Sequence, residues 1–175
     1  MITLRIKRTV RLTLLTLLML LVSHVQTAAA DQPTREPLSP SAFTISGACS
    51  FDVGLEDLVN REIVTTFFDK DGNVTMQIVT GTLKSRLTNL STGESLDVNI
   101  SGPGRTVINP DGSAILTGTG RWLWILLPDF TPPGVQTGLF LISGQQKAVF
   151  DAAGNLIEFT VVGGQVIDLC AELSG

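Results

Sequence analysis

Histidine and tyrosine are almost absent from this chain. It contains no tyrosine and a single histidine, His24, which lies in an N-terminal segment typical of an export signal. Once that segment is removed, no histidine remains. This excludes histidine-based catalytic triads, histidine metal sites and the commonest general base near neutral pH. The composition therefore argues against an enzyme, and we expect neither a metal ion nor a cofactor.

The first thirty residues have the three parts of a signal peptide. A basic start precedes an apolar stretch, Leu12–Val22, and small residues follow at Ala28–Ala30. We expect residues 1–30 to be a signal peptide cleaved after Ala30, and the protein to be secreted. The apolar stretch has eleven residues, whereas about 20 are needed to span a bilayer. No membrane span is therefore expected after cleavage; the alternative is an uncleaved anchor.

Basic residues are scarce beyond the signal segment. Residues 1–30 hold four of the twelve Lys and Arg residues and none of the sixteen acidic ones. The remainder therefore carries eight positive and sixteen negative charges, a net charge of −8. Such a surface repels phosphate backbones and anionic lipids. We expect no nucleic-acid partner.

The chain has only two cysteines, and they lie near the two ends of its remaining length. Cys49 and Cys170 are 121 residues apart, and an even pair in an exported chain favours a disulfide. Closing a loop of that length stabilises the fold by about 4–5 kcal/mol in the chain-entropy interpretation. The alternative, two redox-active thiols, lacks the close Cys-x-x-Cys spacing.

A short lead-in precedes one domain. Residues 31–42 hold three prolines and few apolar side chains, which predicts a flexible lead-in. From Phe43 to Val53 the residues alternate with a period of two, as in a half-buried strand. We expect residues 43–175 to form a single β domain.

Turn signals recur about every twenty residues along that domain. Asp-Gly and Gly-Asn steps supply the positive φ that tight hairpins need, and the segments between them are rich in β-branched and apolar residues. No helical periodicity competes with this pattern. The sequence predicts an up-and-down meander of about seven or eight long antiparallel strands.

Glycines interrupt the middle of nearly every long segment, as at Gly81, Gly118, Gly144 and Gly163–Gly164. Repeated glycines within strands indicate bends or bulges where a sheet curls. We therefore expect an all-β fold in which the meander closes into a barrel, since closure removes exposed sheet edges. The alternative is a two-sheet β-sandwich.

One aromatic segment is the best candidate for ligand binding. Trp122 and Trp124 share a strand face, with Gly118 leaving space beside them, and Arg121 precedes them. Two tryptophans beside small residues are suited to a pocket for an apolar or ring-shaped ligand. The alternative is that both simply fill the interior.

The opposite face of this segment carries Leu123, Ile125 and Leu127. We expect it to be covered by the loop of residues 128–133 or by a partner.

Carboxylates are the remaining route to acid–base catalysis. Asp168 and Glu158 lie between apolar residues in predicted strands. If Cys170 points inward, the register carries Asp168 toward the interior, and Glu158 follows unless the double glycine at 163–164 breaks the alternation. A carboxylate buried near Arg121 or Arg105 would be a candidate catalytic group; the alternative is an ion pair or a solvated surface position.

The two cysteine regions resemble a known family. Cys49-Ser50-Phe51-Asp52-Val53, the Asp168-Leu169-Cys170 end and the Thr-Gly-x-Gly-Arg segment at 117–121 are similar to those of small uncharacterised secreted proteins of actinobacteria and related bacteria. The resemblance implies bacterial export and a disulfide-closed β domain, and it implies no reaction.

These observations lead to three functional hypotheses. The first is an exported β-barrel binding or interaction protein that holds a small apolar ligand or a surface partner. The second is a structural or cell-envelope protein without a small ligand. The third is a cyclase, isomerase or hydrolase that works through Asp168 or Glu158.

Overall fold

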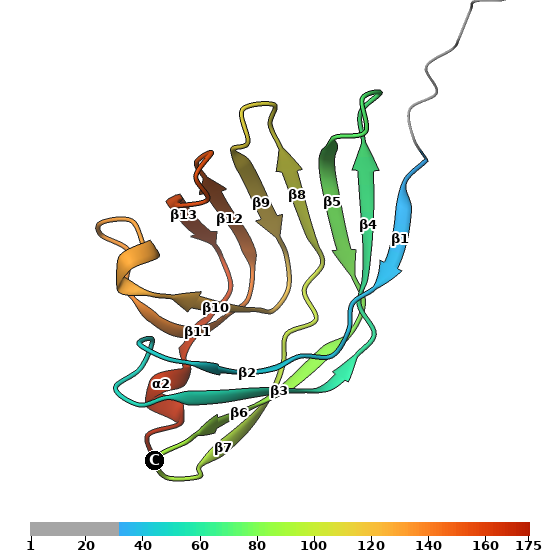
Figure 1. Ribbon diagram of the computed structural model, residues 1–175. Coiled ribbons are helices and arrows are strands. Elements are labelled where there is room, and N and C mark those ends of the chain that lie inside the picture. The colour runs from blue at the N-terminus through green and yellow to red at the C-terminus, as the bar shows by residue number, and fades with distance from the viewer. Residues whose placement is uncertain (1–31) are drawn as a thin grey trace, which may run out of the picture.

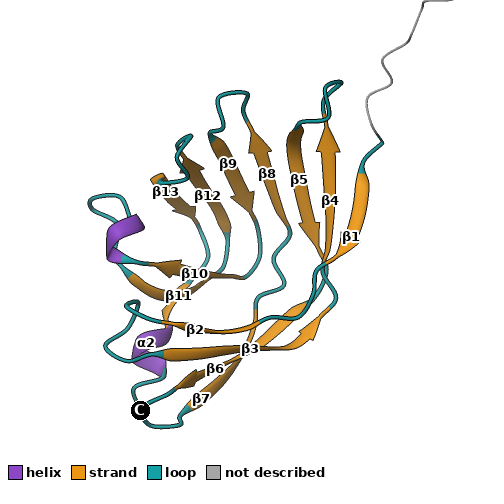
Figure 2. Cartoon of the chain, viewed as in Figure 1, coloured by secondary structure: helices purple, strands orange, loops and turns teal. Residues whose placement is uncertain are grey.

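The computed structural model describes residues 32–175, which form antiparallel β-strands and little helix (Figures 1 and 2). The short helices in this range are the 3-10 helix η1 (Pro128–Phe130) and α2 (Leu169–Glu172). In residues 32–175 no helix is long and apolar enough to cross a bilayer. The predicted signal peptide lies outside the described residues. The all-β prediction is confirmed.

The strands pair in three antiparallel sheets. The seven-stranded upper sheet follows the order β1 (Thr34–Pro37), β4 (Ile63–Phe68), β5 (Val74–Thr80), β8 (Gly104–Ile108), β9 (Ala114–Gly118), β12 (Gln145–Phe150) and β13 (Leu156–Val162). A four-stranded sheet contains β2 (Ala42–Ile45), β3 (Val53–Asn60), β6 (Leu83–Asn89) and β7 (Ser95–Asn99). A three-stranded sheet contains β10 (Trp122–Leu126), β11 (Gly138–Ile142) and β14 (Val166–Asp168).

Each strand of the upper sheet continues, after a bend, into a strand of one of the smaller sheets (Figure 1). Gly81 separates β5 from β6 with a φ of 140°, and Gly144 separates β11 from β12 with a φ of 108°. Other residue types rarely adopt such angles. The predicted meander order and the predicted mid-strand bends are therefore present.

No closed barrel forms among residues 32–175, and the sandwich alternative fits better. β7 and β10 belong to different sheets, while β1 and β13 are the outer strands of the upper sheet. Trp122, the first residue of β10, lies against Gly104 and Gly118 of the upper sheet and against Gly102, which precedes β8. β10 pairs with β11 and not with β7.

The three-stranded sheet is the middle layer of the molecule (Figure 1). One of its faces packs Leu139 and Leu141 against Val53 and Leu87 of the four-stranded sheet. Its other face packs Trp124 and other apolar side chains against β12 and β13. Two apolar cores therefore lie on opposite sides of one sheet.

The expected lead-in is partly a strand. Thr34–Pro37 forms β1, which pairs with β4, and the amide of Leu38 donates a hydrogen bond to the carbonyl of Glu62 (3.0 Å). The prediction of a flexible segment is wrong for these residues, because an edge strand needs only backbone pairing and tolerates proline.

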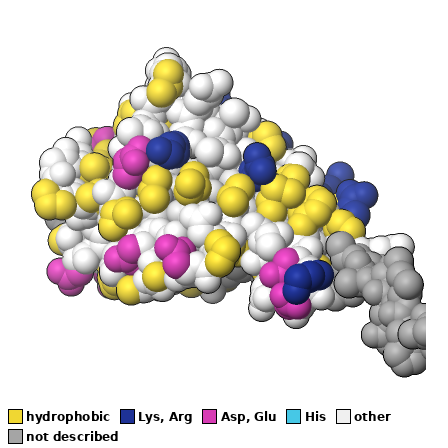
Figure 3. All heavy atoms as spheres, turned by 90° about the horizontal axis from the view of Figure 1, so that it is seen from above, with side chains coloured by type: hydrophobic (Ala, Val, Ile, Leu, Met, Phe, Trp, Pro, Cys, Tyr) yellow, Lys and Arg dark blue, Asp and Glu magenta, His cyan; other side chains and the backbone are white. Residues whose placement is uncertain are grey.

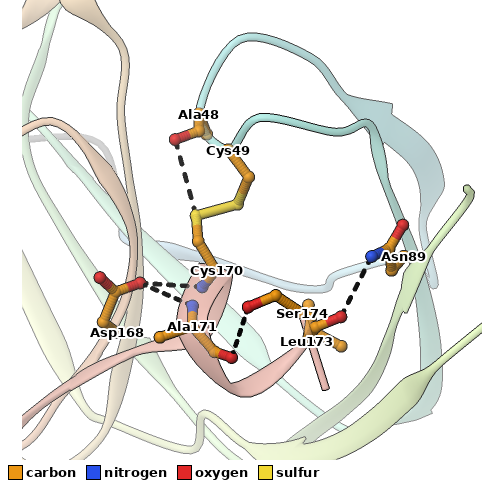
Figure 4. Close-up of a disulfide and its surroundings, with 8 residues drawn as sticks. All are labelled: Ala48, Cys49, Asn89, Asp168, Cys170, Ala171, Leu173 and Ser174. Atoms are coloured by element: carbon orange, nitrogen blue, oxygen red, sulfur yellow. Dashed lines mark hydrogen bonds between the residues drawn. A yellow bond between two sulfur atoms is a disulfide. The ribbon is translucent and has the colours of Figure 1, made fainter. Parts of the chain in front are cut away.

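The predicted disulfide is confirmed. Cys49 and Cys170 are bonded, with their Cα atoms 5.4 Å apart, and this joins the loop after β2 to α2 (Figure 4). Asn89 lies deep in the same region and donates a hydrogen bond from its side chain to the carbonyl of Leu173 (3.1 Å). The C-terminal turn is thus fixed to the four-stranded sheet by one covalent and one polar contact.

Candidate functional site

The two tryptophans have different roles, although they lie on the same face of β10. Their rings are stacked, with centroids 6.2 Å apart and an interplanar angle of 25°. Trp124 is buried, packs edge-on against Phe159 (4.6 Å between centroids) and donates its indole N–H to Gln146. Trp124 is therefore part of the core, as the alternative interpretation of this segment proposed.

Trp122 lies over glycines and lines a cavity. A Cβ added at Gly118 would stand 2.8 Å from Cε2 of the indole, and Gly102 and Gly104 are closer still. These glycines allow the ring to lie against the upper sheet. The indole N–H donates to the carbonyl of Thr119 (3.3 Å), so its one donor is already in use.

The cavity beside Trp122 has a volume of about 190 Å³. It lies where the strands bend from the upper sheet into the smaller sheets. Its lining is almost entirely apolar and comprises Val79, Leu83, Ile100, Gly102, Trp122 and Leu123, with Glu62 as the one ionisable residue. A single carboxylate in such a lining marks the cavity as a candidate binding site.

Glu62 is positioned by backbone contacts on both sides of the bend between β3 and β4. Its amide donates to the side chain of Asn60 (3.1 Å), and its carbonyl accepts from Leu38. Gly81 packs directly against the Arg61–Glu62 backbone, where a Cβ would not fit. The bend is therefore fixed by its contacts with Asn60, Leu38 and Gly81.

Glu62 is largely buried, and its carboxylate has no partner in an ion pair. The residue is 8% exposed, and no ion pair or side-chain hydrogen bond within residues 32–175 involves its carboxylate. No fully buried side-chain N or O atom in the described residues lacks a hydrogen-bond partner, so the carboxylate oxygens keep some contact with solvent at the cavity. Burial raises the pKa of Glu62, and the negative charge of Asp57 raises it further. A carboxylate in this position favours a ligand that supplies hydrogen or positive charge.

The carboxylate of Asp57, in contrast to that of Glu62, accepts several hydrogen bonds. Ser85 donates to one oxygen (2.7 Å), and Ser41 donates to the other from both its amide (2.9 Å) and its hydroxyl (3.0 Å). Burial acts to raise the pKa of Asp57, but these hydrogen bonds and one from Asn60 outweigh it and hold the pKa below its ordinary value. Asp57 is therefore a fixed negative charge near Glu62.

The predicted carboxylates are not in the cavity. Asp168 is exposed and caps α2, accepting hydrogen bonds from the amides of Cys170 and Ala171 (2.9 and 3.2 Å; Figure 4). Glu158 is exposed and forms an ion pair with Lys147 (2.8 Å). The expectation that they face the interior is wrong, because the chain turns into α2 at Asp168 and buries the next residue instead.

Arg121 is also separate from the Trp122 cavity. It is exposed and lines a different groove, of about 310 Å³, together with residues of β7, β14 and α2. Two acidic residues, Asp97 and Glu172, lie in the same groove. The structure therefore does not bring together Arg121 and the cavity-lining face of Trp122.

The apolar face opposite the tryptophans is partly covered within the chain. Leu123 and Ile125 pack against the core between the two smaller sheets. The loop that was expected to cover them instead exposes Phe130, which is 61% accessible. The expected cover by the loop of residues 128–133 is therefore wrong for Leu123 and Ile125, because a sheet distant in sequence packs against them.

Other apolar side chains remain exposed, and four of them are on β13 and β14. Val162 and Val166 are among the most accessible. Figure 3 shows hydrophobic side chains interspersed with charged ones on the face seen from above. No element within residues 32–175 indicates what would cover them, so we assign no site to this surface.

Glu62 was missed by sequence reasoning. In the sequence, Arg61-Glu62 is a charged pair between two apolar strand segments, and this pattern indicates an exposed turn.

Comparison with known proteins found no matching family model, no matching curated protein and no matching solved structure. The cavity is therefore interpreted from its own chemistry.

Proposed function

We propose that this protein is an exported binding protein that holds a small, single-ring ligand in the cavity between Trp122 and Glu62. One observation carries the proposal: the carboxylate of Glu62, a largely buried residue without an ion-pair partner in residues 32–175, lies in an otherwise apolar cavity. Burying a carboxylate in this way is costly unless something compensates it. A bound ligand would provide that compensation.

The size of the cavity limits the ligand. Its volume of about 190 Å³ is smaller than the roughly 300–1,000 Å³ of drug-sized pockets. It is close to the roughly 150 Å³ of an apolar cavity that admits benzene. The ligand class is therefore a molecule with one six-membered ring and a single polar group.

Export is part of the proposal. The signal-like N-terminal segment supports it, and the Cys49–Cys170 disulfide is compatible with an oxidising, extracellular environment. The acidic composition beyond residue 30 adds that a phosphate-rich partner is disfavoured.

Binding is tested by calorimetry on the purified protein with toluene, benzyl alcohol and benzylamine. We expect at least one of the three to bind and to change tryptophan emission, because Trp122 lines the cavity. Val79→Phe fills the cavity and should abolish binding. Ile78→Phe is the matched control, because the neighbouring residue of a strand points to the other face. If none of the three probes binds, the proposal is wrong.

The structural or envelope hypothesis makes a different prediction. It requires retention of the protein in the cell wall and no response to any of the probes. Its sequence-based contact surface was Leu123, Ile125 and Leu127. Leu123 and Ile125 pack against the core, so the exposed apolar residues of β13 and β14 would be the stronger candidates for such a contact.

A carboxylate enzyme is a second candidate, favoured by one observation. Asp57 and Glu62 have pKa values displaced in opposite directions, as acid and base pairs often do. The oxygens of Asp57 are, however, already occupied by hydrogen bonds, which favours a binding role for the cavity. Turnover of a bound ring ether or ester that is lost in Glu62→Gln would support the enzyme.

A further inference from the structure

We infer that the ligand of this cavity is a small organic cation, an ammonium group on a single apolar ring, whose charge is met by Glu62. The inference rests on the proposed binding function and names its ligand class. It follows from three properties of the cavity: its unpaired negative charge, its aromatic wall and the fixed charge behind it.

The first property is the missing positive charge. Glu62 is 8% exposed, and the other six lining residues carry no charge. None of the three ion pairs in the described part of the chain includes it. Buried carboxylates in proteins are normally paired with a cation. Here, the residues that would supply one are absent from the lining, so a ligand cation would complete the pair.

The second property is the indole of Trp122. Aromatic faces attract cations, and tryptophan attracts them most strongly. The N–H of this indole is engaged by the carbonyl of Thr119, so the part of the ring that lines the cavity supplies no hydrogen-bond donor. An anionic ligand would find no free side-chain donor in the lining, whereas an ammonium group finds a carboxylate beside an aromatic wall.

The third property is Asp57. Its hydrogen bonds from Ser85 and Ser41 keep it ionised, and its charge acts on Glu62. Asp57 is the titratable group that influences Glu62, since the rest of the cavity lining is not ionisable. The two carboxylates together attract a cation and repel an anion.

The experiment compares four ligands of similar shape with different charge. Calorimetry at pH 7.5 measures benzylamine, benzyl alcohol, toluene and benzoate binding to the purified protein. We expect benzylamine to bind about tenfold more tightly than benzyl alcohol, the difference typical of a contact to a charged group, and benzoate not to bind. In Glu62→Gln, benzylamine should fall to the affinity of benzyl alcohol. Glu158→Gln, which removes an exposed carboxylate, should change nothing.

A second measurement needs no variant. Lowering the pH protonates Glu62, so benzylamine affinity should fall as the pH drops through the pKa of Glu62, while toluene affinity stays constant. This arm keeps the test valid if Glu62→Gln fails to fold.

The outcomes separate the two proposals. If toluene or benzyl alcohol binds as tightly as benzylamine, the cation inference is wrong and the binding function stands. The same holds if the preference for benzylamine survives in Glu62→Gln or does not vary with pH. If benzoate binds best, the charge argument is reversed and the inference is wrong. If no ligand binds, the proposed function itself fails.

Discussion

Trp122 lies against Gly118 so closely that a Cβ on the glycine would stand 2.8 Å from Cε2 of the indole. This contact explains two features of the molecule together. It fixes the start of β10 against the upper sheet, and it places the indole at the wall of the cavity. The two residues are only four positions apart, at the end of β9 and the start of β10.

Gly118→Ala should therefore displace Trp122. The neighbouring atoms belong to a rigid ring, so we expect a loss of about 1–3 kcal/mol of unfolding free energy, as for other overpacked sites, and a change in tryptophan emission. Urea unfolding measures the first effect. Gly54→Ala is the control, since its Cβ would meet only the flexible, exposed side chain of Leu90 at 3.1 Å. Equal effects of the two variants would contradict this role of Gly118.

Removal of the disulfide should lower stability strongly. The bond closes a loop of 121 residues, and the chain-entropy interpretation gives about 4–5 kcal/mol for that length. The double variant Cys49→Ala/Cys170→Ala is compared with the wild type by urea unfolding. Dithiothreitol should reduce the stability of the wild type to that of the variant. A loss below about 1 kcal/mol would show that the unfolded chain is already constrained in this region.

Gln146 should be far less tolerant of substitution than its neighbour Gln145. Its side chain is buried, accepts from the indole of Trp124 and donates to the carbonyls of Ile142 (3.1 Å) and Gly120 (3.3 Å). Gln146→Leu leaves these buried groups unpaired, which costs about 1–3 kcal/mol for such a group. Gln145→Leu changes an exposed position and serves as the control in thermal unfolding. Similar melting temperatures for the two variants would show that water replaces the lost contacts.

Stability should fall in acid because hydrogen bonds lower the pKa of several aspartates. In the β4–β5 turn, Asn73 donates to Asp69 from its side chain and its backbone, and in the β12–β13 turn Asn155 does the same for Asp151; both pKa values lie below their ordinary range. A pKa lowered by folding adds stability that is complete above the unfolded value of about 3.9 and is lost as the pH falls through the folded value. Urea midpoints between pH 7 and pH 2 measure this. Asp69→Asn/Asp151→Asn should weaken the decline.

Ionisation of Glu62 should have the opposite effect on stability to ionisation of these aspartates. Its pKa is raised by burial and by Asp57, so ionisation opposes folding above the unfolded value of about 4.3, and this cost disappears as the pH falls. Glu62→Gln should therefore be at least as stable as the wild type at pH 7, with the difference vanishing near pH 3. A less stable variant at pH 7 would indicate a stabilising partner for the carboxylate.

Much of the local structure was predictable because its causes are local. The turns around Gly72, Gly112 and Gly154 have positive φ values of 82°, 88° and 85°, as expected from their Asp-Gly and Gly-Asn steps. The bend at Gly81 and the pairing of Cys49 with Cys170 were also predicted. The position of the site was not, because Arg61-Glu62 has the local appearance of an exposed turn.

The sequence by itself determined the antiparallel meander, its turns, its bends and the disulfide. Alternation, glycine conformation and cysteine number act over a few residues or through a single bond. Only the tertiary structure decided that β7 and β10 belong to different sheets, that Leu123 packs against another sheet and that Glu62 is largely buried. These outcomes depend on how one sheet packs on another, and in particular on an indole lying over three glycines, two of them at or just before the start of β8 and one at the end of β9.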